Sequence, residues 1–223
     1  MARIFTQKPN EHLVLVRAND VQLEGNLTVP DHAQGIVLFA HGSGSSRHSP
    51  RNRYVAGVLQ NSGLATLLID LLTSEEEKID LHTKHLRFNI SLLASRLVGV
   101  TDWLMQNPQT QDLAIGYFGA STGAGAALVA ASERTNNIKA VVSRGGRPDL
   151  AGAALTSVIA PTLLIVGGYD TPVIEMNQTA LNQLPGEKHL EIVPRATHLF
   201  EEPGALERVA KLASEWFNRY LEK

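Results

Sequence analysis

Six short apolar runs constrain the fold of this chain more than any other feature of its sequence. They are 35–40, 64–70, 113–118, 138–142, 162–166 and, more weakly, 190–193. Uninterrupted apolar runs of this length are typical of strands that are buried on both faces. Between the runs, apolar residues from Ile90 to Leu104 recur at helical spacings of three and four, and helices are also expected at 122–133, 173–184 and 205–221. Strands that alternate with helices predict a mainly parallel sheet with helices on both faces.

Two further runs, 12–17 and 22–29, precede this pattern and alternate only partly between apolar and polar residues. The turn signal Ala18-Asn19-Asp20 separates them, so they predict an antiparallel hairpin. The expected fold class is therefore α/β, with a mainly parallel central sheet, an N-terminal antiparallel hairpin, helices on both faces and little or no cap domain. A length of 223 residues suits one domain of this kind, which is expected to cover 1–223.

The composition removes several classes of function. Lys and Arg number 20 against 22 Asp and Glu, and the net charge of −2 does not favour nucleic-acid binding. Because cysteine is absent, the chain has no disulfide, no cysteine-ligated metal and no thiol nucleophile. It contains neither H-E-x-x-H nor the phosphate loop G-x-x-x-x-G-K-[ST], so no metal and no cofactor are expected.

The sequence also bears on location. No stretch reaches the roughly 20 apolar residues of a transmembrane helix, and the N-terminus lacks the apolar segment of a secretory signal. A cytoplasmic protein without a membrane partner is the expectation, and the oligomeric state stays open.

The strongest motif is Gly119-Ala120-Ser121-Thr122-Gly123, which follows the run 113–118 and opens the Ala-rich stretch 122–133. In this strand–turn–helix setting, G-x-S-x-G forms a nucleophile elbow with the serine oxygen exposed on a strained turn. The alternative is a Gly- and Ser-rich turn without chemistry. We interpret Ser121 as a nucleophile that needs a base, because a serine hydroxyl is a weak nucleophile at neutral pH.

Candidates for the base and the acid follow the last two predicted strands. His198 lies after the last apolar run and before the final helix, at the edge where the strands end. Asp170 follows the preceding run, whereas its rivals Asp102 and Asp149 lie inside a helix and after a different strand. An acid in this position would orient the imidazole and stabilise its charged form. The order along the chain is nucleophile, acid, base.

Backbone amides near Ser121 are expected to hold the oxyanion of a tetrahedral intermediate. The amide of Thr122 lies at a helix N-terminus, where unpaired N–H groups and the helix dipole favour negative charge. A second amide is expected from the loop His41-Gly42-Ser43-Gly44, and we assign Ser43, with Gly44 as the alternative. His41 is interpreted as a local hydrogen-bonding residue rather than a second base.

These segments, together with Gly168-Tyr169-Asp170 and Ala196-Thr197-His198, resemble the α/β-hydrolase superfamily over about 23–221. Within it, the chain is similar to the dienelactone hydrolase family, and this resemblance implies a small enzyme that acts on an ester or a lactone. Members that open dienelactone rings carry a cysteine at the nucleophile position, where this chain has Ser121. The resemblance therefore implies a serine esterase rather than an enzyme for dienelactone itself.

Arginines at the ends of two predicted strands raise the question of a charged substrate. Arg47, Arg144 and Arg147 are the candidates, because guanidinium groups bind carboxylates and phosphates as forks. Ordinary surface or salt-bridged arginines are the alternative. The highly charged segment 73–86 is interpreted as a solvated helix or loop, and a flap over the carboxyl ends of the strands is the second reading.

The resulting hypothesis is a cofactor-free serine hydrolase for a small-molecule ester or lactone, with an anionic group on the substrate as a further hypothesis. Two other functions stay open. One is a non-catalytic protein that binds a small molecule on the same fold, since fold does not imply activity. The other is an acyltransferase, which would pass the acyl group to an acceptor other than water.

Overall fold

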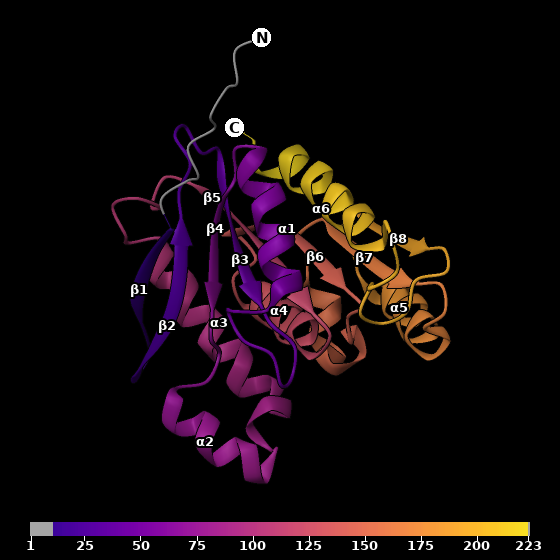
Figure 1. Cartoon of the computed structure of the whole chain (residues 1–223), viewed down its shortest axis with the longest axis horizontal. Coiled ribbons are helices and arrows are strands. Elements are labelled where there is room, and N and C mark those ends of the chain that lie inside the picture. Colours follow the sequence, from indigo (N-terminus) through magenta and orange to yellow (C-terminus); the bar gives the residue numbers. More distant parts are fainter. Residues whose placement is uncertain (1–10, 223) are drawn as a thin grey trace.

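The computed structural model describes residues 11–222 and shows an eight-stranded mixed sheet (Figure 1). The order across the sheet is β1-β2-β4-β3-β5-β6-β7-β8. The strands are β1 (Glu11–Ala18), β2 (Val21–Thr28), β3 (Gly35–Ala40), β4 (Ala65–Ile69), β5 (Ala114–Ala120), β6 (Ile138–Arg144), β7 (Thr162–Gly167) and β8 (Lys188–Val193). Strands β1 and β2 form the predicted antiparallel hairpin, β2 runs antiparallel to β4, and the other neighbours are parallel.

The predicted apolar runs all form strands, and every residue of β3, β4 and β7 is buried. The expectation that 190–193 is buried on both faces is wrong, because β8 lies at the edge of the sheet and only its Val193 is buried. Both β5 and β6 extend two residues beyond the predicted runs, to Ala120 and Arg144. The two extensions pair with each other, since Ala120 lies opposite Arg144 in the register. Because parallel strands end at the same edge, the loops after β3, β5, β6, β7 and β8 gather at one edge of the sheet.

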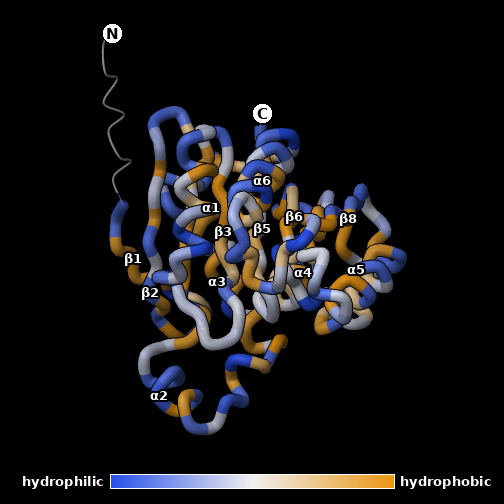
Figure 2. The backbone as a smooth tube through the Cα atoms, turned by 45° about the vertical axis from the view of Figure 1, so that its right-hand side comes forward, coloured by the Kyte–Doolittle hydropathy of each residue, from blue (hydrophilic) through white to orange (hydrophobic). Residues whose placement is uncertain are grey.

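Helices cover both faces of the sheet (Figure 1). They are α1 (Pro50–Asn61), α2 (Ser74–Thr83), α3 (Ile90–Leu104), α4 (Thr122–Glu133), α5 (Thr171–Gln183) and α6 (Ala205–Leu221), with 3-10 segments η1 (Leu86–Phe88) and η2 (Pro148–Ser157). Helices α1 and α6 pack together on one face, and α3, α4, η2 and α5 cover the other. Each face buries its own apolar layer, and the hydrophobic colouring in Figure 2 is concentrated along the central strands. The predicted α/β fold is confirmed.

Helix α1 was not predicted from the sequence, although its start carries a recognisable signal. The Ser49 side chain accepts a hydrogen bond from the amide of Asn52 at 3.3 Å, and Pro50 occupies the first turn. A serine cap followed by proline is a typical helix start. The helix lacks a strong apolar stripe in its sequence, so helical spacing of apolar residues does not predict it.

The charged segment 73–86 forms α2, which projects beyond the sheet at the bottom of Figure 1. A capping box opens it, because Thr73 and Glu76 exchange side-chain and backbone hydrogen bonds of 3.1 and 2.8 Å. At its far end the buried carboxylate of Asp80 forms an ion pair with Arg87. Most of α2 is exposed, as expected for a solvated helix, but its inner side also closes a cavity described below.

Among residues 11–222, no helix combines the length and the apolarity that are needed to cross a bilayer.

Candidate active site

Ser121 lies on a sharp turn between β5 and α4, and its backbone conformation is unusual for a residue with a side chain. Its φ is 50° and its ψ is −123°. Three backbone hydrogen bonds hold this conformation: Ser121 N–H donates to Arg144 O at 3.2 Å, and Ala124 and Arg147 donate to Ser121 O at 3.1 Å each. Strain of this kind persists only where the surroundings enforce it. Although Ser121 is the cap residue of α4, its hydroxyl does not cap the helix and is free for chemistry.

The two glycines of the motif make this turn sterically feasible. A Cβ at Gly119 would lie 2.4 Å from Ala124 Cα, and a Cβ at Gly123 would lie 2.3 Å from the carbonyl oxygen of Ala40. Neither distance is tolerated between nonbonded atoms, so strand and helix approach as closely as they do because side chains are missing there. This is the geometry of a nucleophile elbow.

His198 and Asp170 lie on the loops after β8 and β7, and a hydrogen bond joins them. Nδ1 of His198 lies 2.6 Å from Oδ2 of Asp170. Asp170 is also the cap residue of α5, but its side chain makes no capping bond, so the carboxylate serves the imidazole. A carboxylate on Nδ1 fixes the proton there and leaves Nε2 as the basic nitrogen.

Neighbouring groups hold the His198 loop in place. Thr197 donates to the carboxylate of Glu202 through its amide at 3.0 Å and through its hydroxyl at 2.6 Å. These hydrogen bonds lower the pKa of Glu202. The loop after β7 is tied to the same segment, because the amide of Tyr169 donates to Ala196 O at 2.9 Å. Sequence analysis missed Glu202, whose only signal is its place four residues after the histidine.

Gly145 connects the nucleophile turn with the histidine. It follows Arg144, whose carbonyl accepts the Ser121 amide, and a Cβ at Gly145 would lie 3.5 Å from His198 Cε1. Within residues 11–222 no hydrogen bond joins the Ser121 hydroxyl to His198, and such bonds are often long or poorly aligned in proteins without substrate. The structure thus brings the three predicted residues to one edge of the sheet.

The two alternative acids, Asp102 and Asp149, form ion pairs with arginines. Asp102 pairs with Arg134 through two bonds of 2.8 and 3.0 Å. Asp149 forms a similar fork with Arg147, at 2.7 and 2.9 Å. Neither contacts the imidazole of His198.

The two amides assigned to the oxyanion differ in their surroundings. The amide of Thr122 lies at the start of α4 next to Ser121, at the positive end of the helix dipole. That of Ser43 donates to the hydroxyl oxygen of Thr122 at 2.8 Å. The Ser43 amide therefore has a partner before any substrate arrives.

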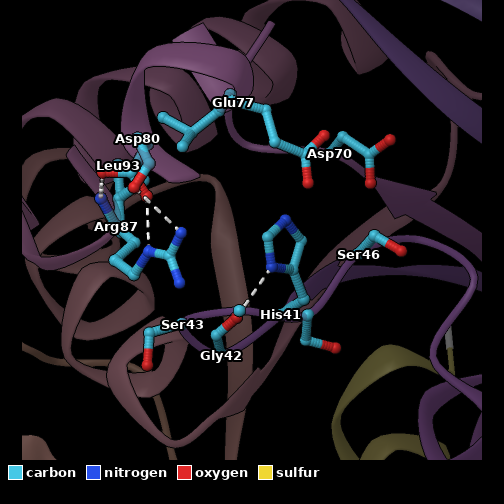
Figure 3. Close-up of a pocket in the computed structure, with 12 residues that line it drawn as sticks. His41, Gly42, Ser43, Ser46, Asp70, Glu77, Asp80, Arg87 and Leu93 are labelled. Carbon is cyan, nitrogen blue, oxygen red and sulfur yellow. Dashed lines mark hydrogen bonds and ion pairs between the residues drawn. The ribbon is translucent and has the colours of Figure 1, made fainter. Parts of the chain in front are cut away.

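His41 fixes the start of the same loop (Figure 3). Its Nδ1 lies 3.0 Å from Gly42 O, and the amide of Leu71 donates to Nε2 at 3.1 Å. Because Nε2 accepts a hydrogen bond, the ring is neutral and carries its proton on Nδ1. Burial lowers the pKa of His41, although the Gly42 carbonyl and the carboxylates of Asp70 and Glu77 act in the opposite direction. His41 is thus a hydrogen-bonding anchor of the loop.

A small cavity separates this loop from α2. It holds about 30 Å³, and its walls include His41 and Ser43 from the loop and Glu77, Asp80 and Arg87 from the α2 region. That volume accommodates about one water molecule rather than a substrate. Figure 3 shows the Asp80–Arg87 pair on one side of it and the Asp70 and Glu77 carboxylates on another. Both readings of segment 73–86 therefore hold in part: α2 is solvated outside and forms a roof over the loop inside.

The low pKa of His41 predicts a pH dependence of stability. Below about pH 6.5, the ordinary histidine pKa, the unfolded chain takes up a proton that the folded chain resists. The contribution of neutral His41 to the free energy of unfolding is therefore complete above that pH. Below it, the free energy of unfolding should decline until the pH has passed the lower pKa of His41 in the folded state. Urea unfolding between about pH 5 and pH 7.5 measures this decline.

His41→Asn is the test variant, because its amide can still donate to Gly42 O but does not titrate. It should flatten the pH dependence, whereas His48→Gln, which removes an exposed imidazole, should not. The charged groups around His41 are Asp70, Glu77 and the Asp80–Arg87 pair, and all are intact in both variants. An unchanged slope in His41→Asn would assign the effect to another group.

The three candidate arginines have different surroundings. Arg47 binds Glu24 at 2.6 Å and also pairs with Asp70, and Arg147 is held by Asp149. Arg144 has no carboxylate partner within residues 11–222, although it is only 7% exposed, and its Nη1 has no hydrogen bond. Burial, and secondly the positive charge of Arg51, lowers the pKa of Arg144 to about 10. Arg144 is thus still charged at neutral pH and is the one candidate whose charge is uncompensated.

In the described part of the chain, no three His, Asp or Glu side chains gather in a way that could hold a metal ion.

The known proteins that this chain resembles include some that are about twice its length and others of about its own length. No family model matches the chain. Two Mycobacterium tuberculosis proteins with the provisional name phosphoribosyl transferase are 62% identical over 208 residues, which is 93% of this chain. The chain spans 46% of the length of these curated relatives.

Solved structures match the whole chain. The crystal structure of a dienelactone hydrolase from Anabaena variabilis is 70% identical, with a TM-score of 0.96 over 97% of this chain and 100% of that one. Est1E from Butyrivibrio proteoclasticus, solved with ferulic acid, shares the fold at 17% identity, with a TM-score of 0.80 over 94% of this chain and 100% of that one. With high identity over its full length to the first of these, the chain belongs to the dienelactone hydrolase family of α/β-hydrolases.

Proposed function

We propose that this protein is a serine hydrolase that cleaves a small carboxylic ester or lactone through an acyl-enzyme intermediate. The observation that carries the proposal is the 2.6 Å bond between His198 Nδ1 and Asp170, at the sheet edge that also bears the strained, uncapped Ser121. A base with a fixed tautomer near a hydroxyl that makes no capping bond is what nucleophilic catalysis by serine requires.

In the proposed mechanism, Ser121 Oγ attacks the substrate carbonyl while Nε2 of His198 takes its proton. Asp170 stabilises the imidazolium that forms, and the amide of Thr122 donates to the oxyanion. His198 returns the proton to the leaving alcohol, so that the C–O bond of the ester breaks and an acyl-Ser121 remains. Water then attacks this intermediate by the same route and releases the acid.

Labelling with a fluorophosphonate tests this proposal directly. Such a probe reacts with a serine that has a working base, and mass spectrometry then locates the adduct. We expect the adduct on Ser121 in the wild type and no adduct in Ser121→Ala. A folded wild-type protein that stays unlabelled would contradict the proposal and favour a non-catalytic binding role. Product analysis with added alcohol or thiol separates hydrolysis from acyl transfer.

We further propose that the preferred ester carries an anionic group, which Arg144 binds. An uncompensated buried guanidinium is costly to the fold, and a carboxylate or phosphate on the substrate would supply the missing charge. Arg144 lies next to the site, because its own carbonyl accepts the Ser121 amide and a Cβ on the next residue would lie 3.5 Å from His198 Cε1.

Removing this guanidinium should therefore weaken the preference for anionic esters. We expect the wild type to prefer the 4-nitrophenyl monoester of succinate over 4-nitrophenyl butyrate, and Arg144→Gln to lose about 1.5–3 kcal/mol of that preference. This corresponds to roughly 10- to 150-fold in kcat/KM. Arg144→Met should raise Tm, since it removes an unpaired buried charge.

Arg147→Gln is the matched control, because that guanidinium is already paired with Asp149 and its loss should leave most of the preference. Equal turnover of the two esters by the wild type, unchanged in Arg144→Gln, would refute the anionic substrate. The serine hydrolase proposal would survive that result.

The name phosphoribosyl transferase is given to mycobacterial relatives of which this chain matches 46%. The His198–Asp170 pair beside Ser121 supports acyl chemistry in this segment and gives no support to phosphoribosyl transfer.

A further inference from the structure

The hydroxyl of Thr122 lies where the substrate oxygen would otherwise bind the Ser43 amide. Its Oγ1 is 2.8 Å from Ser43 N and accepts that N–H. Oxyanion donors work at about 2.7–3.1 Å from the oxygen they stabilise. A substrate oxygen could reach the Ser43 amide only by displacing this hydroxyl.

The hydrogen atom of the Thr122 hydroxyl is unclaimed. Other threonines in helices of this chain, Thr83, Thr101 and Thr179, donate to the carbonyl four residues earlier, at 2.8–3.1 Å. Thr122 is the first residue of α4, and the residue four positions before it belongs to β5. Within residues 11–222 its hydroxyl accepts one hydrogen bond and donates none. A hydroxyl has one hydrogen to donate and two lone pairs, so the donor side remains available.

Thr122 lies next to the proposed nucleophile, in a position that water hardly reaches. It follows the nucleophile, it is only 5% exposed, and its backbone amide belongs to the same helix end. The backbone of the turn is fixed by the hydrogen bonds around Ser121, which limits the freedom of its neighbour. A donor in so dry a position is worth more than one in water.

We infer that the Thr122 hydroxyl is itself the second oxyanion donor, with the Ser43 amide bound behind it. In this arrangement Thr122 gives both its N–H and its Oγ–H to the developing oxyanion. The Ser43 N–H donates to Oγ1, which polarises the hydroxyl and makes it a stronger donor, as in other chains of hydrogen bonds. No proton leaves Thr122 during the reaction. This inference rests on the proposed serine hydrolase function and names Thr122 as a catalytic residue.

We call this arrangement, in which the Ser43 amide binds the Thr122 hydroxyl and the hydroxyl binds the oxyanion, the relay. Two variants at Thr122 distinguish the relay from an arrangement in which the Ser43 amide binds the oxyanion itself. Thr122→Val keeps the shape and removes the hydroxyl, so kcat for a 4-nitrophenyl ester should fall by about 100-fold with little change in KM. Thr122→Ser keeps the hydroxyl and should recover most of the activity. In the rival arrangement the Ser43 amide binds the oxyanion and Thr122 merely competes for it. Thr122→Val would then match or exceed the wild-type kcat, a result that would overturn the inference.

A thionoester substrate distinguishes lost hydrogen bonding from a loosened loop. Sulfur is a weak acceptor, so the wild type should prefer the ester over its thiono analogue, in which sulfur replaces the carbonyl oxygen. Thr122→Val should lose much of that preference, because the two changes remove the same hydrogen bond. If Thr122→Val only displaced the oxyanion loop, the ester and its thiono analogue would be slowed equally. The preference for the ester would then be undiminished, and this result would contradict the relay.

The rate of fluorophosphonate labelling gives a readout that needs no ester. The phosphoryl oxygen of the probe occupies the same oxyanion site, so labelling of Ser121 should be at least about tenfold slower in Thr122→Val than in Thr122→Ser. Equal labelling rates would overturn the inference even if no ester is hydrolysed. A wild type that does not label at all would instead refute the proposed function. Urea unfolding of each variant confirms that the proteins compared are folded.

Discussion

Replacing Ser121 with alanine should lower kcat/KM for an ester by about 10⁴- to 10⁶-fold. The reason is geometric as well as chemical, because the strained turn presents a hydroxyl that makes no other bond to the described residues. Alanine keeps the Cβ and hence the same backbone strain, so the free energy of unfolding should hardly change. Steady-state kinetics with urea unfolding on the same samples measures both quantities.

The three residues of the site should act as one unit. Adding His198→Ala to Ser121→Ala should cost little more than either change alone, since a base without a nucleophile has nothing to activate. Ser132→Ala is the matched control, because its hydroxyl binds Val129 O at 2.7 Å within α4 and its loss should leave kcat/KM within about twofold. If the fold-losses in kcat/KM of the two single variants multiplied in the double variant, the proposed triad would be refuted.

Gly123→Ala should be the most destabilising small substitution near the site. The added Cβ would meet two backbone oxygens, Ala40 O at 2.3 Å and His41 O at 2.4 Å. Neither can move aside as a side chain would, so α4 must shift away from the end of β3. We expect a loss of about 4 kcal/mol or more, a large part of the 5–15 kcal/mol typical of a domain. Urea unfolding, or the soluble yield if the variant fails to fold, measures it.

Gly57→Ala provides the opposite control. Gly57 lies inside α1, and a Cβ there would have no neighbour within 4 Å. Alanine should therefore stabilise the protein by about 0.5–1 kcal/mol through helix propensity and a less flexible unfolded chain. If the two glycine variants unfold at the same urea concentration, the close approach of α4 to β3 does not limit stability.

Much of the fold could be predicted because apolar runs report burial directly. Strands β3 to β7 and helices α3 to α6 were predicted from apolar residues that the fold buries, and Ser121, Asp170 and His198 each follow a predicted strand. Strand β8 was also predicted, although only Val193 of it is buried. Helix α1 was not predicted, because its apolar spacing is weak and only the pair Ser49-Pro50 marks its start. A capping signal can thus mark a helix whose buried face includes a polar residue, here Asn52, and whose apolar spacing is therefore weak.

The ion pairs and hydrogen bonds of the site were harder to predict where the two residues that form them lie far apart in the sequence. Arg47, Arg144 and Arg147 look alike in the sequence, and only the folded chain shows that the first and last meet carboxylates. In the same way, nothing in the sequence reveals that the Ser43 amide meets the hydroxyl of Thr122, 79 residues away. Local patterns predict where a strand ends, but they do not predict which side chain arrives there from another loop.

The roof formed by α2 has a consequence for how such a protein can diversify. Helix α2 lies between β4 and α3, contributes no strand to the sheet and is separated from the oxyanion loop by a cavity of about 30 Å³. The three proposed catalytic residues, in contrast, lie after β5, β7 and β8. We therefore expect that α2 can be exchanged between homologous proteins while Ser121, Asp170 and His198 keep their positions. For a protein engineer, α2 is a segment that can be varied separately from these residues.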